Sequence, residues 1–92
     1  MKTIACIIPS YNQQEFLPEA IESVLAQKRK PNEFIVVDDG STDSSLDYAK
    51  SYEMKGVKVI SQVNKGLPSA RNTGIMNTTS DYILFLDADD ML

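Results

Sequence analysis

The sequence has one cysteine, no long apolar run and little clustered positive charge, and each shortage excludes a class of protein. Cys6 has no partner for an internal disulfide, and its place in the apolar run Ile4–Ile8 indicates a small core residue. No apolar stretch approaches the ~20 residues that a transmembrane helix needs. The N-terminal run is too short for a signal peptide and is interrupted by Pro9, so we expect a cytoplasmic location.

The charge balance argues against a nucleic-acid partner. The formal net charge is -4, whereas affinity for phosphate backbones depends on clustered Lys and Arg. One basic cluster, Lys28–Lys30, precedes Pro31 and is typical of a solvated helix end, where cations suit the dipole. With 92 residues, 42% of them hydrophobic, the chain has room for a single domain over residues 1–92.

Four short apolar runs predict four β-strands. The runs are rich in Ile and Val and are flanked by turn residues. The first, second and fourth hardly alternate, which indicates strands covered on both faces. The third carries Lys58 and is typical of an edge strand. The runs occupy residues 4–8, 34–37, 57–60 and 82–86.

Helical patterns alternate with these strands, over residues 16–25, 46–52 and 68–75. Two starts of the first helix fit equally well, a capping box of Asn12 and Glu15 or a first turn at Pro18. The order β-α-β-α-β-α-β implies right-handed crossovers and a parallel sheet. We predict the strand order 3-2-1-4, because the fourth strand must cross to the far side of the first to create a switch point.

Each predicted strand ends in a cluster of polar residues. In an open parallel sheet these clusters meet along the carboxyl edge, where ligands of such sheets bind. The strand starts carry no comparable set. The clusters occupy residues 9–12, 38–43, 64–66 and 87–90.

Aspartates crowd this predicted edge, although two carboxylates ~4 Å apart repel by ~1 kcal/mol in water and by ~4 kcal/mol at an effective dielectric of ~20. A divalent cation reverses the sign of that energy, and Mg2+ and Mn2+ both accept carboxylate oxygens. Asp87 and Asp89 project to the same side of a continuing strand, which favours a shared metal. Helix capping is the alternative; it is preferred for Asp43 and stays open for Asp90.

Four further residues each have two interpretations. Gly40 suits a tight turn or the close approach of a ligand. Lys65 and Arg71 flank the start of the third helix, whose free N–H groups favour anions. They are either solvated surface charges or counter-charges for a metal-bound diphosphate. Tyr11 suits stacking on a nucleobase or plain packing.

Four segments taken together, "IIPSYNQ", "EFIVVDDGSTDSS", "NKGLPSARNTGI" and "DYILFLDADD", resemble family 2 glycosyltransferases of the GT-A fold. The resemblance extends from Ile4 to Asp90, and the four motifs follow in the expected order and spacing. It implies a three-layer α/β/α, Rossmann-like nucleotide-binding half. It also implies an inverting transferase that takes a sugar from a nucleotide donor, usually UDP-linked, with Mn2+ or Mg2+.

The resemblance assigns positions to the nucleoside. Pro9, Ser10 and Tyr11 match the segment that lines the nucleoside pocket. Asp39 matches the acid that contacts the base, with Asp38 beside it. These residues therefore form the expected nucleoside end of the site.

The resemblance also assigns positions to the diphosphate and the metal. Gly66 and Arg71 match the loop and helix near the base and the diphosphate. The segment Asp87–Asp89 matches the DXD motif, whose first part meets the ribose and whose last acid binds the metal. Asp89, with Asp87, is therefore the expected metal ligand.

Members of this family continue with an acceptor-binding half that supplies the catalytic base, and Asp90 is not at the base position. We therefore expect a donor-binding half, truncated before the acceptor half, that binds a uridine nucleotide weakly without efficient transfer. The acceptor stays open between a sugar, a lipid-linked sugar and a polysaccharide. A non-catalytic, nucleotide-binding or self-associating fragment is the alternative, and we expect self-association through the fourth strand, whose edge and apolar residues would face water.

Overall fold

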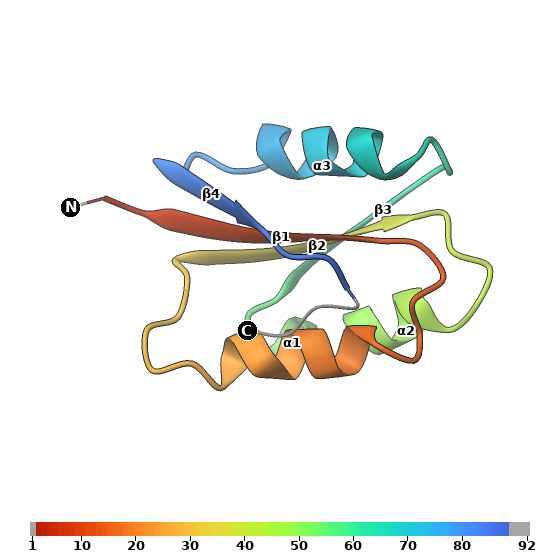
Figure 1. The fold of residues 1–92 in the computed structure, drawn as a ribbon, viewed down its shortest axis with the longest axis horizontal. Coiled ribbons are helices and arrows are strands. Elements are labelled where there is room, and N and C mark those ends of the chain that lie inside the picture. The colour runs from red at the N-terminus through yellow and green to blue at the C-terminus, as the bar shows by residue number, and fades with distance from the viewer. Residues whose placement is uncertain (1, 89–92) are drawn as a thin grey trace.

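A parallel four-stranded sheet forms the centre of the structure. The computed structural model describes residues 2–88. Its strands are β1 (Ile4–Ser10), β2 (Glu33–Asp39), β3 (Lys58–Gln62) and β4 (Tyr82–Phe85). All pairs are parallel and the order is β3-β2-β1-β4, which confirms the predicted topology (Figure 1).

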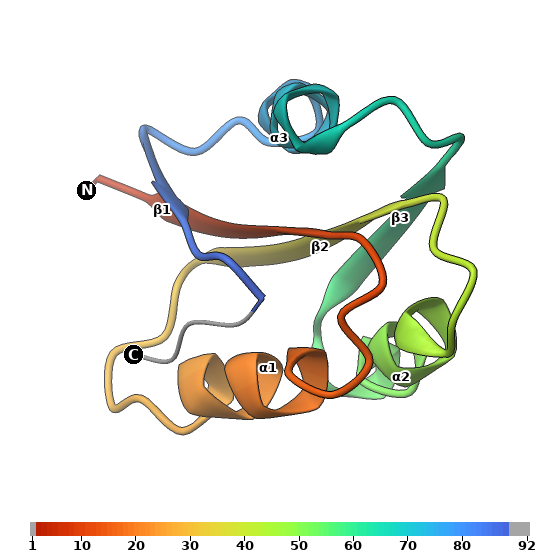
Figure 2. The same cartoon turned by 45° about the vertical axis from the view of Figure 1, so that its right-hand side comes forward.

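Helices cover both faces of the sheet. α1 (Leu17–Leu25) and α2 (Ser45–Lys50) lie on one face, and α3 (Leu67–Met76) lies on the other, as Figures 1 and 2 show. The predicted three-layer α/β/α architecture is therefore confirmed. α2 is shorter than the predicted helix over residues 46–52, because the chain tightens into a 3-10 turn, η1 (Glu53–Lys55).

The two central strands carry eight of the 17 buried hydrophobic residues that the structure describes. Side chains of a strand alternate between its faces, so each central strand serves both helix layers. Cys6 and Ile8 pack on the side of α1, whereas Ile7 and Ile35 pack with Ala70 of α3. Burial raises the pKa of the Cys6 thiol to about 11, in keeping with the predicted role as a core residue.

α1 begins with Pro18 in its first turn, and this decides between the two predicted starts. Proline suits that place, because its fixed φ is helical and its missing N–H would be unpaired there anyway. Asn12 does not cap the helix. Its backbone has a φ of 51°, and its Oδ1 accepts a 2.8 Å hydrogen bond from the N–H of Thr42.

α3 lies unusually close to the sheet. Its buried residues are the small Ala70 and Gly74. A Cβ added at Gly74 would come within 2.6 Å of Cγ2 of Ile7, so a glycine is needed for this helix-to-strand approach. The residues of α3 that face away from the sheet are thereby held at a defined distance from the end of β1.

β4 is the exposed member of the sheet, so the prediction that this strand is covered on both faces is wrong. Within residues 2–88 it pairs with β1 alone, and Tyr82, Leu84 and Phe85 are exposed. An open strand edge beside apolar side chains matches the expected surface for self-association, which itself stays a prediction. None of the helices within residues 2–88 has the length and apolar character required to cross a bilayer.

Candidate functional site

A pocket at the carboxyl edge of the sheet brings several predicted residues together. It lies where β1 ends, α3 begins and the chain leaves β4, and its volume is about 220 Å³. The position agrees with the ligand-binding edge expected for an open parallel sheet. The lining residues are Pro9, Tyr11, Gln13, Leu67, Arg71, Asp87 and Ala88.

Arg71 and Asp87 form an ion pair across this pocket. Nη2 of Arg71 lies 3.6 Å from Oδ1 of Asp87, and the two side chains are 38% and 55% exposed. An exposed pair of this length contributes little to stability, typically about 0–1 kcal/mol. Both charges therefore remain accessible to a ligand.

Tyr11 and Ser10 point into different surroundings, although they are neighbours. Tyr11 lines the pocket and is 39% exposed, so its ring is available for stacking. Ser10 is fully buried, and its register partner on β2 is Asp38. Within residues 2–88, Ser10 Oγ and Asp38 Oδ1 have no hydrogen-bond partner, while Asp38 Oδ2 accepts the N–H of Ser41 at 3.0 Å.

Asp39 is buried and fully engaged. It is 1% exposed, because β2 continues to this residue instead of ending before it. Its two oxygens accept hydrogen bonds from a side-chain amide of Gln62, at 2.8 Å, and from the backbone N–H groups of Lys65 and Gly66, both at 2.9 Å. Burial by itself raises the pKa of Asp39, but these hydrogen bonds outweigh it and the net pKa is lowered.

Gly40 lets two loops of this edge meet. A Cβ at Gly40 would lie 2.7 Å from the backbone N of Asn64, and its φ of 69° is in the left-handed region. The structure therefore supports the interpretation of Gly40 as a turn residue, at a place where another backbone segment comes close. The approaching backbone is the loop between β3 and α3, on the same side of the molecule as the loop after β2 (Figure 2).

Asp43 lies one residue before the N-cap of α2, so it is not the capping residue that the sequence predicted, although its side chain contacts the first turn. Its Oδ1 accepts the N–H of Ser45 at 2.8 Å and the Ser45 hydroxyl at 2.6 Å, although Ser44 is the N-cap residue. Burial raises the pKa of Asp43, but the bonds from Ser45 and from the N–H of Gln14 outweigh it and lower the pKa.

The predicted acidic cluster is therefore divided. Asp87 is on the pocket wall, whereas Asp38 and Asp39 are buried under the loops that follow β2 and β3. Asp89 and Asp90 lie outside the described residues. Within residues 2–88, no three potential metal ligands gather, and hydrogen-bond donors offset the charge of Asp39.

Sequence reasoning missed three kinds of residue at this edge. Gln13 and Leu67 line the pocket, and both belong to segments that carry the family resemblance, yet the resemblance assigns a role to neither. Gln62 was overlooked because β3 extends to it, past the predicted strand. Lys65 was considered for its side chain, but the structure engages its backbone N–H.

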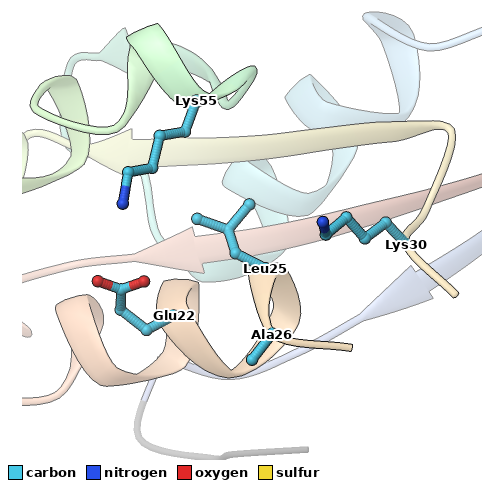
Figure 3. Close-up of a pocket in the computed structure, with 5 residues that line it drawn as sticks. All are labelled: Glu22, Leu25, Ala26, Lys30 and Lys55. Carbon is cyan, nitrogen blue, oxygen red and sulfur yellow. The ribbon is translucent and has the colours of Figure 1, made fainter. Parts of the chain in front are cut away.

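A second pocket of about 340 Å³ lies at the opposite end of α1 and contains none of the predicted residues. Figure 3 shows the Lys55 side chain extending toward Glu22, with Leu25 to one side of the two and Lys30 further along that side. Volume alone therefore does not identify the functional site. This pocket has mixed surface charges, while the smaller one combines an aromatic ring, a cation and a carboxylate at the ligand-binding edge.

Known sequences resemble this chain over almost its whole length. The profile described as "Glycosyl transferase family 2" matches residues 5–92. Glycosyltransferase GlyA of Streptococcus pneumoniae is 38% identical over 91 residues, which are 97% of this chain and 13% of that protein. An uncharacterized glycosyltransferase of Bacillus subtilis, EpsJ, is 43% identical over 89 residues, which are 95% of this chain and 26% of that protein. The chain thus spans 13% to 26% of the length of these relatives.

Solved structures show the same architecture. S. aureus TarS 1-349 in complex with UDP-GlcNAc superposes with a TM-score of 0.87 at 34% identity, covering 99% of this chain and 27% of that one. The mannosyltransferase PcManGT from Pyrobaculum calidifontis, in complex with GDP-Man and Mn2+, has a TM-score of 0.88 at 22% identity, covering 99% and 29%. At that lower identity the likeness concerns the GT-A fold alone. Because the family profile matches nearly every residue, the chain belongs to glycosyl transferase family 2.

Proposed function

We propose that the pocket lined by Tyr11, Arg71 and Asp87 binds the nucleotide of a nucleotide-sugar donor, and that the whole protein transfers the sugar with inversion. The observation that carries this proposal is the combination of ring, cation and carboxylate in one depression at the carboxyl edge. TarS, a family relative at 34% identity, is described in complex with UDP and with UDP-GlcNAc, which favours a uridine nucleotide.

The nucleoside would lie at the Tyr11 end of the pocket. The Tyr11 ring offers a stacking surface, and Pro9 forms the adjoining wall. Ser10 and Asp38 are buried below this wall, each with an unpaired oxygen within the described structure. The predicted contact between Asp39 and the base stays a prediction.

The diphosphate would lie at the Arg71 end. A guanidinium matches phosphate oxygens with two parallel N–H groups, and α3 begins beside it, after Gly66. Helix N-termini favour anions, because their first N–H groups lack partners. Arg71 is paired with Asp87 at 3.6 Å, so binding of phosphate would exchange one anionic partner for another.

The chemistry of the pocket fits a divalent cation, Mn2+ or Mg2+. Such ions are commonly held by one or two carboxylates together with substrate phosphates. Asp87 offers an accessible carboxylate next to the proposed diphosphate position, and Asp89, outside the described residues, would be the second. When bound, the cation would neutralise charge on the departing diphosphate.

The acceptor site and the catalytic base belong, in this proposal, to parts of a longer protein. The support is that the chain spans 13% of GlyA, 26% of EpsJ and 27% of TarS 1-349. A positioned base is typically worth about 100- to 10,000-fold in rate. The 92-residue chain should therefore bind a donor without transferring its sugar efficiently.

Calorimetry with UDP and uridine tests the binding proposal. UDP should bind in the presence of Mn2+. Removing the metal with EDTA should lower the affinity for UDP by about tenfold or more, because opposite charges ~4 Å apart interact by ~4 kcal/mol at an effective dielectric of ~20. Uridine affinity should not respond to EDTA. Lys55→Ala, in the pocket of Figure 3, is the control and should bind UDP like wild type.

The outcomes separate the parts of the proposal. Absence of UDP binding in Mn2+ would remove the nucleotide assignment. Equal UDP affinity with and without EDTA would contradict the proposed metal site. Efficient acceptor-dependent sugar transfer by the 92-residue chain would show that the base and acceptor site are already present.

A further inference from the structure

We propose that Asn12 is a positioning residue that ties the segment after β1 to the segment after β2 and thereby fixes the ring of Tyr11. This inference rests on the proposed nucleotide site. Asn12 lies between Tyr11 and Gln13, which both line the pocket, whereas Asn12 is outside the lining that the described residues form. A residue that holds this stretch of backbone therefore holds two parts of the pocket wall.

The side chain of Asn12 reaches the segment after β2. Its Oδ1 accepts hydrogen bonds from the backbone N–H groups of Thr42, at 2.8 Å, and Asp43, at 3.3 Å. In the other direction, the backbone N–H of Asn12 donates to Oγ of Ser41 at 2.9 Å. The two segments are therefore joined by bonds in both directions, and Asn12 takes part in each of these bonds.

Asn12 also has a backbone conformation that few residue types adopt. Its φ is 51°, and within residues 2–88 it is the only residue other than glycine with a positive φ. Asparagine, aspartate and glycine enter this left-handed region more readily than other residues. Asn12 thus supplies both the turn that redirects the chain after β1 and the acceptor that fixes it.

Further hydrogen bonds continue the contact past this residue. The N–H of Gln13 donates to Oγ of Ser45 at 2.8 Å, and the N–H of Ser44 donates to Oε1 of Gln14 at 2.9 Å. Ser45 is fully buried in the first turn of α2, so the segment is anchored to a fixed element. Tyr11 is thereby held between the end of β1 and an anchored backbone.

The ring of Tyr11 benefits from this support because it is 39% exposed and lies beyond the last residue of β1. A side chain that becomes ordered only on binding costs affinity, whereas one that is already in place does not. Loss of the Asn12 bonds should therefore weaken binding of a nucleoside, although Asn12 itself makes no contact with it.

Asn12→Gly tests the inference by the affinities of uridine and pyrophosphate, followed through amide shifts in NMR spectra in the presence of Mg2+. Glycine keeps the left-handed backbone and removes the acceptor. Uridine affinity should fall about fivefold, the scale of ordering one side chain on binding. Pyrophosphate, which would bind at the Arg71 end, should keep its affinity. Unchanged uridine affinity, or an equal loss for both ligands, would overturn the inference.

Asn12→Asp separates the acceptor from the other effects of substitution. Aspartate keeps an oxygen at the Oδ1 position and also tolerates a positive φ. Because uridine is uncharged, the added carboxylate should not repel it. The affinity of Asn12→Asp for uridine should therefore stay within about twofold of wild type. An affinity no higher than that of Asn12→Gly would overturn the inference.

Asn32→Gly is the matched control, because Asn32 makes an equivalent bond at the opposite edge of the sheet. It precedes β2, and its Oδ1 accepts the N–H of Ile4, also at 2.8 Å. Both ligand affinities should equal those of wild type. A loss of uridine affinity as large as that of Asn12→Gly would show that general destabilisation explains the result, and would overturn the inference.

Hydrogen exchange of individual amides tests the tie between the segments without any ligand. In the wild-type chain the amides of Thr42 and Gln13 should be protected, and in Asn12→Gly both should exchange at least about tenfold faster. Unchanged exchange at Gln13 would overturn the inference. If the wild-type chain binds neither uridine nor UDP, the proposed function fails, while the exchange experiment still decides whether Asn12 ties the two segments.

Ser41→Ala provides a second variant in case Asn12→Gly does not fold. It removes the acceptor of the Asn12 N–H and leaves the Asn12 side chain in place. Uridine affinity should fall about threefold, with pyrophosphate affinity unchanged, because one bond of the tie is lost. Uridine affinity equal to that of wild type would overturn the inference.

Discussion

Asp39 and Asp87 stand at the same edge of one sheet, yet their surroundings differ in every respect. Asp39 is 1% exposed and accepts four hydrogen bonds from the β3–α3 segment. Asp87 has a side chain that is 55% exposed and a single described ion pair, 3.6 Å long, with Arg71. Residue type and strand position therefore do not decide what a carboxylate does. The role of a carboxylate is decided by the number of N–H donors that the fold brings to it.

The largest expected effect is on stability, and it should separate the two aspartates. Asp39→Ala leaves the N–H groups of Lys65 and Gly66 without their acceptor and should lower the free energy of unfolding by about 3 kcal/mol. Asp87→Ala removes one exposed ion pair and should change it by less than about 0.5 kcal/mol. Urea denaturation followed by circular dichroism measures both, and equal losses would abolish the distinction.

Metal-dependent nucleotide binding should require the carboxylate of Asp87. Asp87→Asn should weaken UDP about tenfold in Mn2+ and leave its affinity in EDTA unchanged, because only the metal-bound state uses the carboxylate charge. Arg71→Ala should weaken UDP in both conditions, since the guanidinium faces the phosphates directly. Calorimetry of the two variants checks this. Loss of UDP affinity by Asp87→Asn in EDTA would assign Asp87 a role without metal.

Low pH should remove the stabilising contribution of the Asp39 carboxylate. The pKa of Asp39 is lowered on folding, so its stabilising contribution is present above the unfolded pKa, about 4, and is lost as the pH falls below that value. Asp39→Asn should therefore lose less stability than wild type between about pH 5 and pH 3. Urea midpoints across this range measure the difference. Identical slopes in both proteins would mean that Asp39 titrates alike in the folded and unfolded states.

The smallest expected effect concerns the exposed strand. Tyr82, Leu84 and Phe85 lie on or beside an open edge, which favours weak association of two chains. Light scattering at about 100 µM should detect dimers of the wild-type chain, because weak homodimers form at such concentrations. Leu84→Lys should abolish the dimers without changing the fold. A monomeric wild-type chain would contradict the prediction.

Local patterns determined the elements and their order. Short apolar runs indicated the strands because burial on both faces selects Ile and Val, and the connection rules for parallel strands then led to the order β3-β2-β1-β4. Tyr11, Arg71 and Asp87 could be assigned to one pocket because they belong to segments that end or begin at the same sheet edge. Element limits were less exact: β2 and β3 extend further than their apolar runs, and α2 is shorter than its stripe.

Only the tertiary structure decided which aspartates are free. The donors to Asp39 lie 23 to 27 residues further along the chain, so no local pattern reveals them. Gly40 and Gly74 likewise acquire their meaning from Asn64 and Ile7, which are distant in sequence. The sequence by itself therefore determined the fold and the edge that carries the candidate site. The separation of a buried, hydrogen-bonded carboxylate from an accessible one arose only when β3 and α3 packed against the end of β2, because hydrogen bonds are short-ranged and directional.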